Sequence, residues 1–116
     1  MIKFRFYDKE SRIDRAWYDS SNVLYSECED KENDYKMLKV VFGKGSTYLY
    51  KNIDVNDYLM FMVGGLDGSN GKALNKFIKA KYEVEKLPNT DLAQLNGMME
   101  YFKRRKKEEE EKNIKI

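Results

Sequence analysis

Histidine is absent from this chain of 116 residues, and cysteine, proline and tryptophan each occur only once. Without histidine the chain lacks the commonest general base, and one cysteine leaves no zinc site of ordinary composition. Cys28 alone forms no internal disulfide, which fits a reducing cytoplasm. No apolar run approaches the ~20 residues of a membrane span, and Met1–Tyr7 alternates instead of forming a signal segment. We therefore expect a cytoplasmic protein with no membrane partner, no metal and no cofactor.

Charge is plentiful but unevenly distributed. Charged residues make up 36% of the chain, and the net charge is only +2. Residues 1–68 carry ten Lys or Arg against twelve Asp or Glu, a net −2, whereas residues 69–87 carry five Lys against two Glu, a net +3. A local positive excess attracts an anion, although a solvated basic helix face is the alternative interpretation.

Period-two hydrophobic alternation dominates the first half of the chain. It predicts strands near residues 2–7, 13–17, 23–28, 37–42 and 47–50, with Gly43–Gly45 as a hairpin connection. Residues 82–87 alternate again, as in an extended arm or an edge strand. Short strands at this spacing favour an antiparallel meander.

Helical periodicity replaces alternation after Ile53. Asp54 is a plausible N-cap for a short helix that ends at Gly64-Gly65, and a second helix is expected from about Gly71. Thr90 is expected to cap a third helix, whose apolar stripe is Leu92, Leu95, Met99 and Phe102. That stripe must be buried on the sheet or against another subunit.

The predicted fold class is therefore α+β, an antiparallel meander of about five strands followed by two or three helices packed on it. Pro88 marks the expected boundary between a domain of residues 1–87 and a C-terminal helix with a charged tail, residues 88–116. A homo-oligomer formed through the C-terminal helix would bury the apolar stripe of that helix.

Two polar signatures are the best candidates for a ligand site. They are Asp19–Asn22 and Ser69–Lys79, the second of which opens a basic helix. Ser69, Gly71 and Asn75 offer hydrogen bonds, and Lys72 and Lys79 offer positive charge. The full phosphate-loop pattern is not met, so no nucleotide triphosphatase is predicted. In the alternative interpretation Ser69 caps the helix, Gly71 relieves a tight turn, and Asn75 closes the strand–helix junction.

Aromatic and arginine side chains could complete such a site. Tyr48 and Tyr50 share one side of their strand and form a candidate stacking platform, although core aromatics are commoner. Arg104 and Arg105 could clamp a phosphate, particularly across a dimer interface, or form only a solvated basic face. Cys28 has no neighbouring base, and no carboxylates are paired for acid–base work, so catalysis is not expected.

Several segments of the chain, taken together, resemble the KTSC domain, a small module named for its occurrence at the C-terminus of some lysyl-tRNA synthetases. The matching pieces, in order, are Asp19–Asn22, the strand Leu38–Phe42, Tyr48–Tyr50, the helix opening at Asp54, and Ser69–Lys79. They cover about residues 17–87. The resemblance implies the fold more than the function. The chain departs from the family where an aromatic residue and a histidine are usual, at Leu74 and Phe77.

The size, the strand-rich front and the C-terminal helices also look like the phage Thoeris anti-defence proteins that act as sponges. That second resemblance implies a homo-oligomer that sequesters a cyclic ADP-ribose-type signal without cleaving it. We accordingly expect a non-catalytic binding protein for a small nucleotide-like anion. The alternatives are an RNA- or tRNA-binding accessory module, which a net charge of only +2 disfavours, and a protein inhibitor of a host factor.

Overall fold

The computed structural model describes residues 2–19, 22–31, 35–64 and 69–114. Six strands follow one another in the sheet in chain order, and all neighbours are antiparallel. They are β1 (Ile2–Asp8), β2 (Ile13–Tyr18), β3 (Val23–Asp30), β4 (Tyr35–Phe42), β5 (Thr47–Asp54) and β6 (Val84–Leu87). The predicted α+β meander is confirmed, and the alternating segment after residue 82 supplies its sixth strand at the edge.

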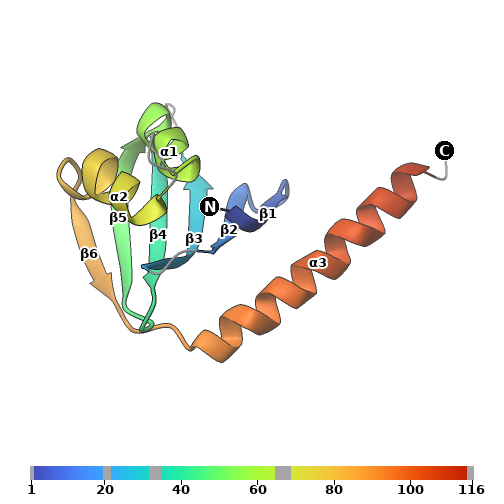
Figure 1. Ribbon diagram of the computed structural model, residues 1–116. Helices are drawn as coiled ribbons and strands as arrows, with labels where there is room; N and C mark the ends of the chain where they lie inside the picture. Colours follow the sequence, from blue (N-terminus) through green and yellow to red (C-terminus); the bar gives the residue numbers. More distant parts are fainter. Residues whose placement is uncertain (1, 20–21, 32–34, 65–68, 115–116) are drawn as a thin grey trace.

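The helices lie in two groups. Between β5 and β6 come α1 (Val55–Met62), α2 (Asn70–Ala73) and the π-helix η2 (Leu74–Lys79), and α3 (Leu92–Ile114) ends the chain. Figure 1 shows α1 and α2 together over one end of the sheet, while α3 runs as a long rod past the β1–β2 hairpin. None of the helices within the described residues is both long and apolar enough to cross a bilayer.

Both faces of the sheet are buried, each by a different helical group. Because side chains alternate along a strand, neighbouring residues of β2 enter two separate cores. Tyr18 packs with Val40, Tyr50, Leu74 and Ile78 beneath α1 and η2. On the opposite face, Trp17 packs with Phe6, Tyr25, Leu95, Met99 and Phe102 beneath α3. The sheet is therefore the middle layer of three.

Three of the four residues of the α3 stripe are buried within the chain itself, whereas Leu92 is 37% exposed. Leu95, Met99 and Phe102 are buried against the sheet, and Phe102 lies 5.1 Å from the Phe6 ring, centroid to centroid. Trp17 Nε1 also donates a hydrogen bond to the carbonyl of Leu95 at 3.1 Å. The sequence allowed this stripe to be buried on the sheet or against another subunit. In the structure Leu95, Met99 and Phe102 are buried on the sheet, which needs no second subunit. The expected boundary at Pro88 thus falls between two parts that share one core.

The segment that leads into α3 is fixed by Gly45 and Thr90. Gly45 has a φ of +92°, and a Cβ added there would lie 2.7 Å from the carbonyl oxygen of Thr90. The Thr90 N–H donates to the Gly45 carbonyl at 2.8 Å, and the Thr90 hydroxyl bonds the Thr47 hydroxyl at 2.7 Å. The sequence predicted that Thr90 caps α3, but its hydroxyl bonds Thr47 instead. Asp91 caps α3, because its Oδ1 accepts from the Ala93 N–H at 2.9 Å.

Candidate functional site

The two polar signatures meet in space, and their contact is a packing contact. Gly71 is buried, and a Cβ added to it would lie 3.0 Å from Asn22 Nδ2 and 3.2 Å from Asn22 Cβ. The Asn22 carbonyl also accepts a hydrogen bond from the Gly43 N–H at 2.9 Å. Gly71 is thus required by the close approach of α2 to the start of β3. Ser20 and Ser21 of the first signature lie outside the described residues.

Ser69 and Asn70 stabilise helix ends. Ser69 Oγ accepts from the Lys72 N–H at 3.4 Å, the capping role that was the alternative to ligand contact. Asn70 is 0% exposed, and its Nδ2 donates to the carbonyls of Phe61 and Met62 at 2.7 and 3.3 Å. These carbonyls end α1, so the amide satisfies groups that the helix leaves unpaired. Both side chains therefore have structural partners.

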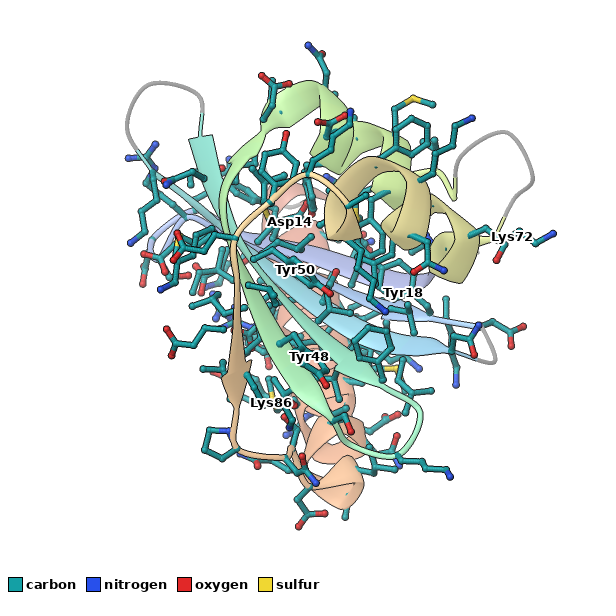
Figure 2. The ribbon with its side chains drawn as sticks, turned by 90° about the vertical axis from the view of Figure 1, so that its left-hand side faces the viewer. Asp14, Tyr18, Tyr48, Tyr50, Lys72 and Lys86 are labelled. Carbon is teal, nitrogen blue, oxygen red and sulfur yellow. The ribbon has the colours of Figure 1, made fainter. Side chains whose placement is uncertain are left out.

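The cations of the second signature face solvent. Lys72, Asn75, Lys76 and Lys79 are exposed, and no acidic residue occurs between Ser69 and Tyr82. Figure 2 shows Lys72 at the side of α2, pointing away from the sheet and well separated from Tyr48. The predicted combination of Lys72 with a tyrosine platform therefore does not form one compact pocket. The lysines instead form a basic outer surface.

Tyr48 and Tyr50 share a face of β5 as predicted, but only one of them is accessible. Tyr50 is 2% exposed within the core, and burial raises the pKa of its hydroxyl. The structure therefore excludes Tyr50 from the predicted stacking platform. Tyr48 is only partly buried, and the Phe42 ring meets it edge-on at 5.7 Å. Tyr48 thus remains the candidate stacking residue.

Lys86, which sequence reasoning did not single out, lies over the Tyr48 ring. Its Nζ is 5.2 Å from the ring centroid, because β6 pairs with β5 in a register that places Lys86 opposite Tyr48. The same Nζ donates to the Leu87 carbonyl at 3.0 Å and to Asn89 Oδ1 at 2.9 Å, so the ammonium group is held in place. We call Phe42, Tyr48 and Lys86 the Tyr48 surface, of which Figure 2 labels Tyr48 and Lys86.

Arg104 and Arg105 lie on α3, across the sheet from α2. Arg105 stacks over the Phe6 ring at 5.2 Å and pairs with Asp8 and Glu109 at 3.4 and 3.7 Å. Arg104 is exposed on the same helix. Within one chain neither arginine can close a site that contains Lys72, because the sheet lies between α3 and α2. A phosphate clamp across a dimer interface stays a prediction.

The buried polar groups hold the fold together. Asp14 is buried, and its carboxylate accepts from Arg5 at 2.7, 2.9 and 3.1 Å and from the Tyr58 hydroxyl at 2.8 Å. Cys28 is also buried, and burial raises the pKa of its thiol to about 12. A thiol in this state supplies no thiolate near neutral pH. Among the described residues there is no group of three His, Cys, Asp or Glu placed to hold a metal ion.

The fold and these surfaces define an α+β protein with a six-stranded meander between two helical layers and a cation-flanked aromatic surface on one face. The chain matches no protein-family model, and no curated protein is similar to it in sequence. The resemblances to the KTSC domain and to the anti-defence sponges therefore stay predictions.

Proposed function

We propose that the protein binds a small nucleotide-derived anion at the Tyr48 surface and holds it without turnover. The observation that carries the proposal is the position of Lys86 Nζ, 5.2 Å from the centroid of a partly exposed Tyr48 ring. A base or similar ring stacks on an aromatic side chain for roughly 1–3 kcal/mol, and an adjacent ammonium group pairs with a phosphate.

The geometry of the Tyr48 surface is fixed before a ligand arrives. Phe42 supports the Tyr48 ring edge-on, and the two acceptors of Lys86 hold its ammonium group near that ring. Preorganised groups lose little conformational entropy on binding, so more of the interaction energy appears as affinity. Phe77 packs against the same core as Tyr48, and the ammonium group of Lys76 lies over its ring, with Nζ 5.4 Å from the ring centroid.

The exposed cations of α2 and η2 support the proposal through longer-range attraction. Lys72, Lys76 and Lys79 are exposed in a segment without acidic residues, so they raise the local concentration of anions near this face of the sheet. Their role in this proposal is to attract the ligand.

Sequestration without chemistry fits the residues that are available. The one thiol is buried with a raised pKa, and Asp14 is fully engaged by Arg5 and Tyr58. In the resemblance to the Thoeris anti-defence sponges, the ligand is a cyclic ADP-ribose-type immune signal in the host cytoplasm. A homo-oligomer through α3 is part of the same prediction, and light scattering of the purified protein measures it directly.

Calorimetric titration with cyclic ADP-ribose, ADP-ribose and 3′,5′-cyclic AMP tests this proposal. We expect binding of at least one of them, weakened about tenfold by Lys86→Ala and by Tyr48→Leu, since each change removes one contact of about 1.4 kcal/mol. The matched control is Lys51→Ala, which removes a lysine of β5 that pairs with Glu85 at 3.0 Å. Heating the complex should release the ligand intact. No binding by any of the three, or release of a cleaved product, would refute the proposal.

A second candidate function, RNA binding, is favoured by the acid-free lysine surface of α2 and η2. Phosphate contacts of this kind produce affinity that falls steeply with salt and rises with oligonucleotide length. The same titrations with single-stranded RNA of increasing length, at low and high salt, decide between the two. Affinity that depends on Lys72 and on length, with no response to Tyr48→Leu, would favour RNA.

A further inference from the structure

On the α3 side of the sheet there is a cleft of about 410 Å³, a size that falls within the range of small-molecule sites. It lies between the sheet and the first turns of α3. Glu27, Lys39 and Val41 line it from the sheet, and Asn89, Asp91 and Gln94 line it from the linker and α3. None of the predicted site residues lines it, and its link to the Tyr48 surface is the hydrogen bond from Lys86 to Asn89.

The walls of the cleft are rigidly connected. Thr90 is bonded to Gly45 in the turn between β4 and β5 and to Thr47 at the start of β5, and Asp91 caps α3. One turn later, the Leu95 carbonyl accepts from Trp17 on β2. Thr90 and Leu95, which both line the cleft, thus join its helix side to the sheet. A ligand would find a site that is already shaped.

The electrostatic centre of the cleft is Glu27. Its carboxylate accepts from the Tyr25 hydroxyl at 2.6 Å and lies 3.3 Å from Lys39 Nζ and 3.9 Å from Arg15 Nε. Arg15 Nε and Nη1 are buried without a hydrogen-bond partner among the described residues, and the guanidinium stacks on Phe102 at 4.6 Å.

The charge of the lining disfavours an anionic ligand. Glu27 and Asp91 contribute two carboxylates and Lys39 one ammonium group to the lining, and the Arg15 guanidinium outside the lining pairs with Glu27 at 3.9 Å, so the cleft has no net positive charge to hold a phosphate. Asp91 Oδ1 caps α3, which leaves its second oxygen as an acceptor. A phosphate placed here would meet two carboxylates, whereas hydroxyl and amino groups would find acceptors.

The remaining polar groups favour a heterocycle with an amide-like edge. Gln94 contributes a carboxamide, a group that forms paired hydrogen bonds with the edge of a nucleobase. Asn89 contributes a second carboxamide, whose Nδ2 can donate while its Oδ1 accepts from Lys86 Nζ at 2.9 Å. Val41 and Met98 supply apolar surface for the ring faces. Carboxylates such as Glu27 and Asp91 accept hydrogen bonds from ribose hydroxyls.

We infer that this cleft binds an uncharged nucleoside, with its base against the Asn89–Gln94 wall and its ribose toward the carboxylates. The ligand differs from that of the Tyr48 surface in one decisive respect. Added phosphate should weaken binding in the cleft because it would face the carboxylates of Glu27 and Asp91, whereas it should strengthen binding at the cationic Tyr48 surface.

Titration of the full chain with adenosine, guanosine, cytidine and uridine, each compared with its 5′-monophosphate, its free base and ribose, tests the inference. We expect at least one nucleoside to bind more tightly than the matching monophosphate, base or ribose. Gln94→Ala should weaken that binding about tenfold, because it removes a paired carboxamide contact. Alanine is a better helix former than glutamine at this exposed position, so the variant should fold.

The control is Asn96→Ala, which removes a carboxamide two residues further along α3 that lines a different, smaller cavity beside Trp17. It should leave nucleoside affinity unchanged. The inference is overturned if no nucleoside binds at millimolar concentration, or if the monophosphate binds more tightly than the nucleoside. It is also overturned if Tyr48→Leu, rather than Gln94→Ala, abolishes binding, since the ligand would then occupy the Tyr48 surface.

Discussion

Replacing Phe102 by alanine should show whether α3 and the sheet unfold as one unit. The Phe102 side chain is 7% exposed, and its ring packs against Phe6 at 5.1 Å and Trp17 at 6.3 Å, with the Arg15 guanidinium at 4.6 Å. Removing a buried phenylalanine ring costs about 3–5 kcal/mol when the cavity does not collapse. Because Phe102 also covers a buried guanidinium, we expect about 4 kcal/mol, near the middle of that range.

The assay is denaturant unfolding followed by Trp17 fluorescence, because the only tryptophan lies beneath α3. For a chain of this length, a loss of 4 kcal/mol lowers the melting temperature by roughly 16 °C. The matched control is Tyr101→Ala, one residue earlier, where the side chain is 48% exposed. It should cost about 1 kcal/mol or less. Equal and small losses in both variants would show that α3 does not share a core with the sheet.

Two further predictions concern single side chains. Burial alone would raise the pKa of the Asp8 carboxyl, but the backbone N–H of Glu10 and the nearby Arg105 guanidinium outweigh it and lower that pKa. The resulting stabilisation is present above the unfolded pKa of about 3.9 and is lost as the pH falls through the folded value. The melting temperature of Asp8→Asn should therefore lie below that of the native protein at pH 6, and the gap should close toward pH 3. A constant gap would contradict this assignment. Cys28 should react with a thiol reagent at pH 8 only after denaturation, because burial raises its pKa to about 12. Rapid reaction of the folded protein would show that β3 opens readily.

Much of the fold is predictable because local chemistry determines it. The alternation of β1 to β5, the Asp54 cap of α1 and the Gly45 hairpin are all present as the sequence indicates. The cap of α3 is the exception. Thr90 and Asp91 are both good capping residues, and only the position of Thr47 on another strand decides that the Thr90 hydroxyl is used elsewhere.

The candidate site was less predictable, because it depends on pairings between distant segments. Period-two alternation places Tyr48 and Tyr50 on the same face but does not say that α1 and η2 cover Tyr50 and leave Tyr48 partly open. The partnership of Tyr48 with Lys86 follows from the β5–β6 register, which no local pattern specifies. Likewise, a basic run on α3 does not reveal which face of the sheet the helix covers, nor that Arg105 pairs with Asp8 of β1.

The sheet separates two surfaces for which we have proposed different ligands. On one face an ammonium group lies over a partly exposed ring, and on the other a cleft presents carboxamides and carboxylates. Ligand charge is therefore the variable expected to separate the two sites, since a phosphate should add affinity at the first and remove it at the second. The short linker from β6 to α3 connects them, because Lys86 of the first surface donates to Asn89 of the second. A titration series that varies only phosphate content thus assigns each bound ligand to a face before any mutant is made.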